Sequence, residues 1–103
     1  MVENKYLRLN AKIAEVWEVV GTHEIWITGL DKKLKIKVLK IVSSESDNPY
    51  MGVSNLKVKG KDCADYYQSL HNQSTKEEAL NDAIRGFFAF YSDDADVKEV
   101  EDW

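Results

Sequence analysis

Several stretches of the chain alternate between polar and apolar residues with the period of a β-strand. Lysine holds every second position over 33–38, and it does so again over 57–61. Successive side chains of a strand point to opposite faces, so each run directs its lysines to one face and its aliphatic residues to the other. Together with the β-branched stretch 23–28, these runs predict strands over 23–28, 34–42 and 51–59.

The connections between these strands carry turn signals. The segment 29–32 begins with glycine and predicts a hairpin between the first two strands, and an Asn-Pro pair marks the loop after the second. Within the second strand the alternation changes phase. Lysine occupies the odd-numbered positions up to 37, but the next odd-numbered position is Leu39. This slip predicts a bulge or bend near residues 38–40, and it removes Lys40 from the lysine-bearing face.

The strongest helical signal lies near the C-terminal end. Ser74 and Glu77 have the spacing of a capping box, in which the two side chains satisfy backbone N–H groups of the first turn. Gly86, inside the helical pattern, is interpreted as a point of close packing against the sheet. We expect a helix over about residues 75–91, whose buried face is formed by Leu80, Ala83, Ile84, Phe87, Phe88 and Tyr91. Phe90 lies outside this apolar face of the helical pattern.

The first 20 residues carry two patterns. A helix over 11–20 would begin at Asn10, end at Gly21 and place Leu9, Ile13, Val16, Trp17 and Val20 on one face. The strand alternative rests on the alternation over 7–13 and on the valines at 16, 19 and 20. We interpret the stretch as a helix and keep the strand as the alternative.

These elements predict a small α+β domain. An antiparallel sheet of three to four strands carries the C-terminal helix on one face, and a short N-terminal helix gives the order α-β-β-β-α. The length of 103 residues suits one domain, which we assign to residues 1–92, followed by an acidic C-terminal tail over 93–103. The element order is similar to that of double-stranded-RNA-binding domains. Those domains carry lysines at the start of the last helix, where this chain has Glu77 and Glu78, so that family is not assigned.

Composition places the chain among soluble globular proteins. Apolar residues make up 44% and charged residues 31% of the sequence, which argues against disordered and fibrous classes. No apolar run approaches the roughly 20 residues that cross a bilayer, and the first residues lack the apolar core of a signal peptide. The single cysteine, Cys63, agrees with a reducing compartment. We therefore expect a cytoplasmic protein without a membrane partner.

The net charge of −4 is unevenly distributed. Residues 93–103 carry six acidic side chains and one lysine, a charge of −5, which leaves +1 for residues 1–92. Such a segment is typical of a solvated end; the alternatives are an interaction arm and a competitor for a basic site on the same protein. Its last residue, Trp103, is an aromatic side chain that can dock in a groove.

The candidate binding surface is the lysine-bearing face of the predicted sheet. Such a face is commonly the wet side of an antiparallel sheet, but it can also accept an acidic protein surface or nucleic-acid phosphates. A pI of about 5.1, two arginines in the whole chain and the lack of an aromatic between the lysines argue against nucleic acid. We predict that a partner binds at Lys33, Lys35, Lys37, Lys57, Lys59, Phe90 and Trp103.

Catalytic and metal-binding chemistry has no recognisable motif. Cys63, His71 and His23 match neither the arrangement of a cysteine nucleophile with its base nor the paired spacing of zinc ligands. The acidic stretch 93–96 lacks the glycine and the terminal glutamate of a calcium loop. We predict no catalytic residues, no metal and no cofactor.

These observations favour a small non-catalytic protein-binding or regulatory module. Such modules occur among phage- or plasmid-type accessory proteins, a class suggested here by size and by the missing catalytic motifs. Another protein is the expected partner, and a second copy of the chain, forming a homodimer, is an alternative. The alternative function is weak, shape-dependent nucleic-acid binding through the lysine-rich sheet face.

Overall fold

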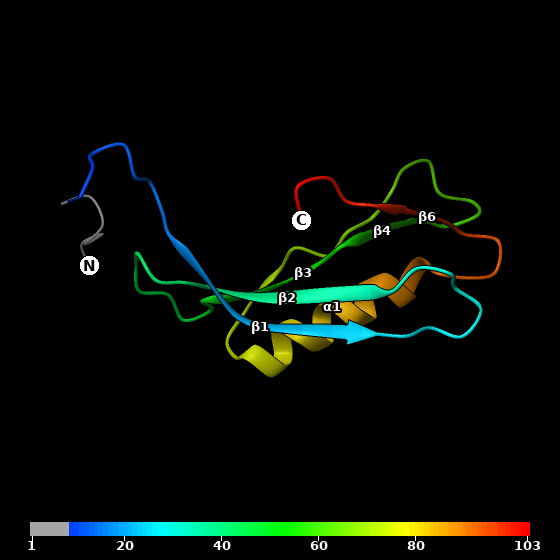
Figure 1. The fold of residues 1–103 in the computed structure, drawn as a ribbon, viewed down its shortest axis with the longest axis horizontal. Helices are drawn as coiled ribbons and strands as arrows, with labels where there is room; N and C mark the ends of the chain where they lie inside the picture. Colours follow the sequence, from blue (N-terminus) through cyan, green and yellow to red (C-terminus); the bar gives the residue numbers. More distant parts are fainter. Residues whose placement is uncertain (1–8) are drawn as a thin grey trace.

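A computed structural model describes residues 9–103, which form two antiparallel sheets and one helix (Figure 1). The larger sheet has the strand order β1-β2-β3-β5, and the smaller pairs β4 with β6. The predicted α+β class is confirmed, and the antiparallel sheet, expected to have three to four strands, has four; the second sheet was not predicted, and the predicted order α-β-β-β-α is not observed. In chain order the elements are β1 (Trp17–Ile25), β2 (Leu34–Ile41), β3 (Tyr50–Ser54), β4 (Leu56–Lys59), β5 (Asn72–Gln73), α1 (Lys76–Phe90) and β6 (Asp96–Glu99).

The core lies between α1 and one face of the strands. Its tightest point is Gly52 on β3, where an added Cβ would lie 2.3 Å from the backbone oxygen of Ala79. Only glycine lets the helix backbone approach the strand this closely. The aliphatic residues that alternate with the lysines fill the rest of this layer. The buried cluster comprises Leu34, Ile36, Leu56, Val58, Ala83 and Phe87.

The helix predicted over 75–91 is confirmed, with Thr75 as its N-cap and Tyr91 as its C-cap. The capping pair lies one residue later than expected, because Thr75 Oγ1 accepts the bond from Glu78 N at 3.1 Å. The predicted buried face holds except at one position. Phe88 is 44% exposed, and it packs edge-on against Phe87 rather than entering the core.

The predicted N-terminal helix over 11–20 is wrong. Asn10 does cap a turn, since its side chain accepts from Lys12 N and its carbonyl accepts from Ile13 N, but no helix follows. From Trp17 onward the chain is β1, paired along its length with β2. The β-branched valines pack more readily in a strand, and the cross-strand ladder supplies the hydrogen bonds that a short helix would have made alone.

The predicted bulge is present in the sheet but on the neighbouring strand. The register of the β1–β2 pair shifts between Val19 and Gly21, opposite Leu39 and Val38 of β2. Strand β2 itself keeps an unbroken register with β3. Leu39 therefore lies on the lysine-bearing face of a regular strand. The unpaired residue of the bulge is Val20 of β1.

The predicted third strand, 51–59, is divided at Asn55 into β3 and β4. Up to Ser54 the strand pairs with β2, and after Asn55 it pairs with β6. The Asn55 side chain takes over the β2 partnership at the break, accepting from Lys35 N at 2.7 Å and donating to the Lys33 carbonyl at 3.1 Å. This exchange lets one continuous segment serve both sheets.

Part of the segment expected to be a solvated acidic tail is a strand. Val97 of β6 packs against the core, and beyond β6 the chain turns back toward β3 (Figure 1). The Val100 N–H donates to the Asn55 carbonyl at 2.7 Å, and Trp103 Nε1 donates to the Val53 carbonyl at 2.7 Å. Within residues 9–103, no helix has the length and apolar character needed to span a bilayer.

Candidate functional site

The two lysine runs lie on the same side of the core. Lys35 and Lys37 alternate with the buried side chains of β2, and Lys57 and Lys59 alternate with those of β4. Because the buried residues of both strands belong to one cluster with α1, both sets of lysines point away from the helix. We call Lys33, Lys35, Lys37, Lys57 and Lys59 the lysine face.

Aromatic side chains from the loop before β2 and from the C-terminal end lie against this face. Lys33 Nζ is 4.3 Å from the ring centroid of Trp26 and also forms an ion pair with Glu24 at 3.2 Å. Lys37 Nζ is 4.8 Å from the ring centroid of Trp103. The sequence argument found no aromatic beside the lysines because these rings come from a loop and from the C-terminal end.

A third ring, Tyr66, gathers lysines from both strands of the small sheet. The distances from its centroid to the Nζ atoms of Lys57, Lys59 and Lys98 are 5.4, 6.0 and 4.9 Å. We call these four residues the Tyr66 cluster. The Tyr66 hydroxyl donates to the Asp96 carboxylate, and this bond raises the pKa of Tyr66 above its ordinary value.

Phe90 lies at the C-terminal end of α1 and is 38% exposed. Its ring centroid is 4.9 Å from that of Tyr67, which lies in the connection between β4 and β5. Phe90 therefore closes one edge of the core while part of its ring faces solvent. Trp103 differs from Phe90, because its indole nitrogen is hydrogen-bonded and its ring is only partly exposed.

Cys63, His71 and His23 lie in three different parts of the fold. Cys63 ends a turn, in which its backbone N–H donates to the Gly60 carbonyl. His23 is an exposed residue of β1. His71 Nδ1 lies 3.0 Å from Ser69 Oγ and 3.2 Å from Asp82 Oδ2. Among the described residues, no group of three or more His, Cys, Asp or Glu could hold a metal ion.

The Ser69–His71–Asp82 contact has the residue types of a nucleophile relay but a different geometry. In such a relay the carboxylate binds one ring nitrogen of the histidine, and the serine meets the other nitrogen. Here both groups meet Nδ1, and Ser69, which is 4% exposed, donates directly to Asp82 at 2.6 Å. The contact fastens the segment before β5 to the helix.

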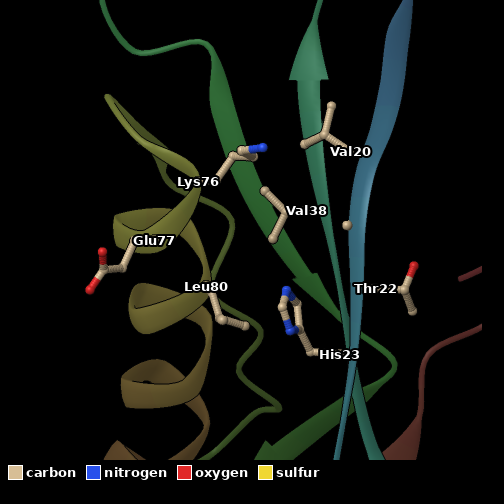
Figure 2. Close-up of a pocket in the computed structure, with 8 residues that line it drawn as sticks. Val20, Thr22, His23, Val38, Lys76, Glu77 and Leu80 are labelled. Atoms are coloured by element: carbon tan, nitrogen blue, oxygen red, sulfur yellow. The ribbon is translucent and has the colours of Figure 1, made fainter.

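A groove of about 390 Å³ opens between β1 and the first turns of α1 (Figure 2). Val38 of β2 and Leu80 of the helix line it, and His23 extends from β1 toward Leu80. The bulge residue Val20 lies at one end of the groove, and Lys76 extends toward it from the helix. Sequence reasoning missed this groove because its two walls are more than 50 residues apart in the chain.

The strand that forms one wall of the groove is an edge strand. β1 pairs with β2 on one side, and among residues 9–103 no other strand pairs with it. Its nine residues contain neither the lysine nor the proline that often protects exposed edges, and the bulge at Val20 is the feature that interrupts the edge. The described structure therefore places an apolar groove beside a long strand edge that carries hydrogen-bonding groups.

Comparison with known proteins gives no relative from which a function could be transferred. The sequence matches no family model and no curated protein, and the fold matches no solved structure. Any functional assignment therefore rests on the residues and their geometry.

Proposed function

We propose that the chain is a small non-catalytic protein-binding module that takes an extended segment of a partner protein along the outer edge of β1. An apolar side chain of that segment enters the groove between β1 and α1. The observation that carries this proposal is the position of the groove directly beside an edge strand of nine residues.

Strand addition uses both features at once. Backbone groups of the added segment bond to the free edge of the sheet, and pockets beside the edge select every second side chain. Val20, Val38 and Leu80 offer apolar surface to the side chain that points toward the helix. A groove without a strand edge would supply only half of this recognition.

Charge favours a basic residue in the bound segment. Glu18 and Glu24 are exposed on β1, and cross-strand pairs of opposite charge stabilise neighbouring strands by roughly 0.2–1 kcal/mol. Glu24 pairs with Lys33, whereas Glu18 lies opposite Lys40 of β2 without an ion pair among residues 9–103, so Glu18 is the carboxylate that we expect an added strand to use. We therefore expect an apolar residue with a lysine or arginine nearby.

Selection from a displayed library of random ten-residue peptides tests the proposal. Enriched peptides are synthesised, and their affinity for the wild-type protein is measured by fluorescence anisotropy. His23→Trp fills the groove from an exposed position, so we expect it to weaken binding at least tenfold. The matched control is Val19→Trp, because Val19 is 55% exposed on the same strand and its cross-strand partner, Leu39, lies on the opposite face.

Hydrogen exchange supplies the second readout. Binding should protect backbone amides of β1, since the added strand bonds to that edge. Enriched peptides that bind His23→Trp as tightly as the wild type, or that protect the lysine face instead, would contradict the proposal. Self-association of the free protein that His23→Trp abolishes would assign the groove to a second copy of the chain.

Nucleic-acid binding through the lysine face is the second candidate. The observation that favours it is the presence of Trp26, Tyr66 and Trp103 beside the lysines, because aromatic rings next to cationic side chains can stack on bases. The pI of about 5.1 and the acidic C-terminal segment oppose it.

Electrophoretic shift at low and moderate salt tests this candidate with single-stranded and duplex RNA and DNA. Substitution of Lys33, Lys35 and Lys37 by glutamine should abolish a genuine shift. The same change at Lys12, Lys32 and Lys76, which removes equal charge outside the lysine face, should leave it intact. The absence of a shift with the wild type in every condition eliminates the candidate.

A further inference from the structure

The outer face of the small sheet concentrates positive charge around one aromatic ring. Lys57 of β4 and Lys98 of β6 are direct cross-strand partners, and Lys59 is the partner of Asp96. All three ammonium groups lie within 6.0 Å of the Tyr66 centroid. Tyr66 itself comes from the connection between β4 and β5, so three separate segments build the cluster.

The charges of this cluster are not balanced. Lys57 and Lys98 are like charges that lie directly opposite each other. Such an arrangement destabilises a strand pair. Asp96 contributes one negative charge, but its carboxylate accepts the Tyr66 hydroxyl. Among the described residues, none of the three lysines forms an ion pair. Attraction to the ring reduces the repulsion between the ammonium groups, yet it leaves two positive charges in excess.

We propose that the Tyr66 cluster binds a single phosphate group, with Lys57, Lys59 and Lys98 as its donors. A phosphate offers several strong acceptor oxygens and the negative charge that the cluster lacks, and lysine binds phosphate as a point charge. The site lies on the side of the strands that faces away from α1, so it does not depend on the β1–α1 groove.

The surroundings of the cluster favour one phosphate group over a nucleic-acid strand. Asp94 precedes β6 and is paired with Lys61 at 4.0 Å. Farther along, Glu101 and Asp102 follow the strand. These carboxylates border the cluster along the chain and would repel the successive phosphates of a polyanion. A phosphate monoester, whether free or on a modified side chain, meets the lysines without extending over the acids.

Titration of the ¹⁵N-labelled protein with inorganic phosphate tests the site, with sodium chloride used to hold the ionic strength constant. We expect saturable shifts of the backbone resonances of Lys57, Tyr66 and Lys98. The Lys57→Gln/Lys98→Gln variant should bind at least tenfold more weakly. The control, Lys12→Gln/Lys32→Gln, removes the same charge elsewhere and should bind like the wild type.

Folding of the variants is checked by thermal unfolding. Removing the opposed ammonium groups relieves repulsion, so the double variant should melt at or above the temperature of the wild type without phosphate. If it does not fold, Lys98→Gln alone, on an exposed position of β6, should still weaken phosphate binding.

Separate arms identify the source of the phosphate. O-Phosphoserine should reproduce the shifts seen with inorganic phosphate, whereas serine should not. If the two double variants lose phosphate binding equally, the binding depends only on the net charge of the protein, and the proposal is overturned. Tighter binding of a single-stranded oligonucleotide than of phosphate, with shifts over both lysine runs, would replace it by a polyanion surface.

Discussion

At the residue scale, Asn55 shows how one side chain can replace a backbone partner. Its amide group accepts from Lys35 N and donates to the Lys33 carbonyl, while its own backbone carbonyl accepts from Val100 N. Asparagine provides both a donor and an acceptor on a short side chain, which a strand junction of this kind needs. The residue therefore connects β2, the β3–β4 segment and the C-terminal end.

Substitution of this residue tests its role. Asn55→Ala leaves the Lys35 N–H and the Lys33 carbonyl without their partner in a half-buried position, so we expect a loss of about 2 kcal/mol in the free energy of unfolding. Urea denaturation followed by circular dichroism measures the change. Asn48→Ala, in an exposed loop, should change the unfolding free energy little, and equal effects of the two variants would contradict the assigned role.

Tyr66 gives a prediction about pH. Its hydroxyl is bonded to Asp96, which holds its pKa above the ordinary value of 10.0. A raised pKa in the folded state means that the bond contributes stability below pH 10 and that this contribution disappears as the pH rises through the folded value. Asp96→Asn should therefore lower the pKa of Tyr66.

Spectrophotometric titration of the tyrosines measures this shift. The signal of Tyr66 is obtained as the difference between each protein and its counterpart carrying Tyr66→Phe. An unchanged pKa in the Asp96→Asn variant would show that the hydrogen bond does not control the ionisation of Tyr66.

At the scale of elements, α1 was predicted from its own residues because its signals are local. The helix begins at Thr75, whose hydroxyl accepts from Glu78 N, while Ser74 Oγ donates to the Glu78 carboxylate at 2.8 Å. The adjacent Ser74 and Thr75, followed by Glu77 and Glu78, offer two capping pairs one residue apart. In the structure the later pair caps the helix, through Thr75 and Glu78.

Substitution of each candidate cap tests whether Thr75 or Ser74 caps the helix. Thr75→Ala should lower the free energy of unfolding by about 1 kcal/mol, because the Glu78 N–H loses its acceptor. Ser74→Ala removes only a bond between exposed side chains and should cost less. Thermal unfolding of the two variants compares them, and a larger loss for Ser74→Ala would indicate that Ser74 is the true cap.

The strand β1 shows the opposite case at the same scale. Its first residues, 17–20, satisfy a helical and a strand pattern alike, and the choice follows from partners elsewhere in the chain. β2 supplies a ladder along all of β1, and Ser43 Oγ accepts from Val16 N just before the strand begins. A short isolated helix has no such support, so tertiary pairing overrides the local pattern.

At the scale of the whole molecule, the C-terminal segment joins both sheets. β6 completes the small sheet, and Trp103 reaches the larger one by donating to the Val53 carbonyl and lying beneath Lys37. Deleting residues 93–103 would thus remove a strand together with its acidic charge. An experiment that aims to uncover the lysine face needs smaller changes than this deletion.

A single substitution measures how firmly this segment is held. Trp103→Ala removes a half-buried hydrogen bond and a cation–π contact, so we expect a loss of about 1–2 kcal/mol in the free energy of unfolding. Trp26→Ala is the matched control, since Trp26 is 78% exposed and contacts Lys33 without a hydrogen bond from its indole nitrogen among the described residues. Similar denaturation midpoints for the two variants would mean that Trp103 is not anchored.

The candidate sites also have a part that the sequence predicts and a part that only the tertiary structure shows. Alternation placed Lys33, Lys35, Lys37, Lys57 and Lys59 opposite the core, because a strand has a period of two wherever it lies. The contact of Lys37 with Trp103, the third lysine of the Tyr66 cluster and the β1–α1 groove depend on segments far apart in the chain. Pairing and packing across such separations leave no periodic signal in a single sequence.

The sequence by itself determined the α+β class, the C-terminal helix and the face on which each strand carries its lysines, because these follow from local periodicity and capping. Tertiary structure alone decided that residues 17–20 belong to a strand, that Asn55 divides one strand between two sheets, and that the acidic end pairs with β4. Each of those outcomes depends on hydrogen bonds and burial that form only when distant segments meet.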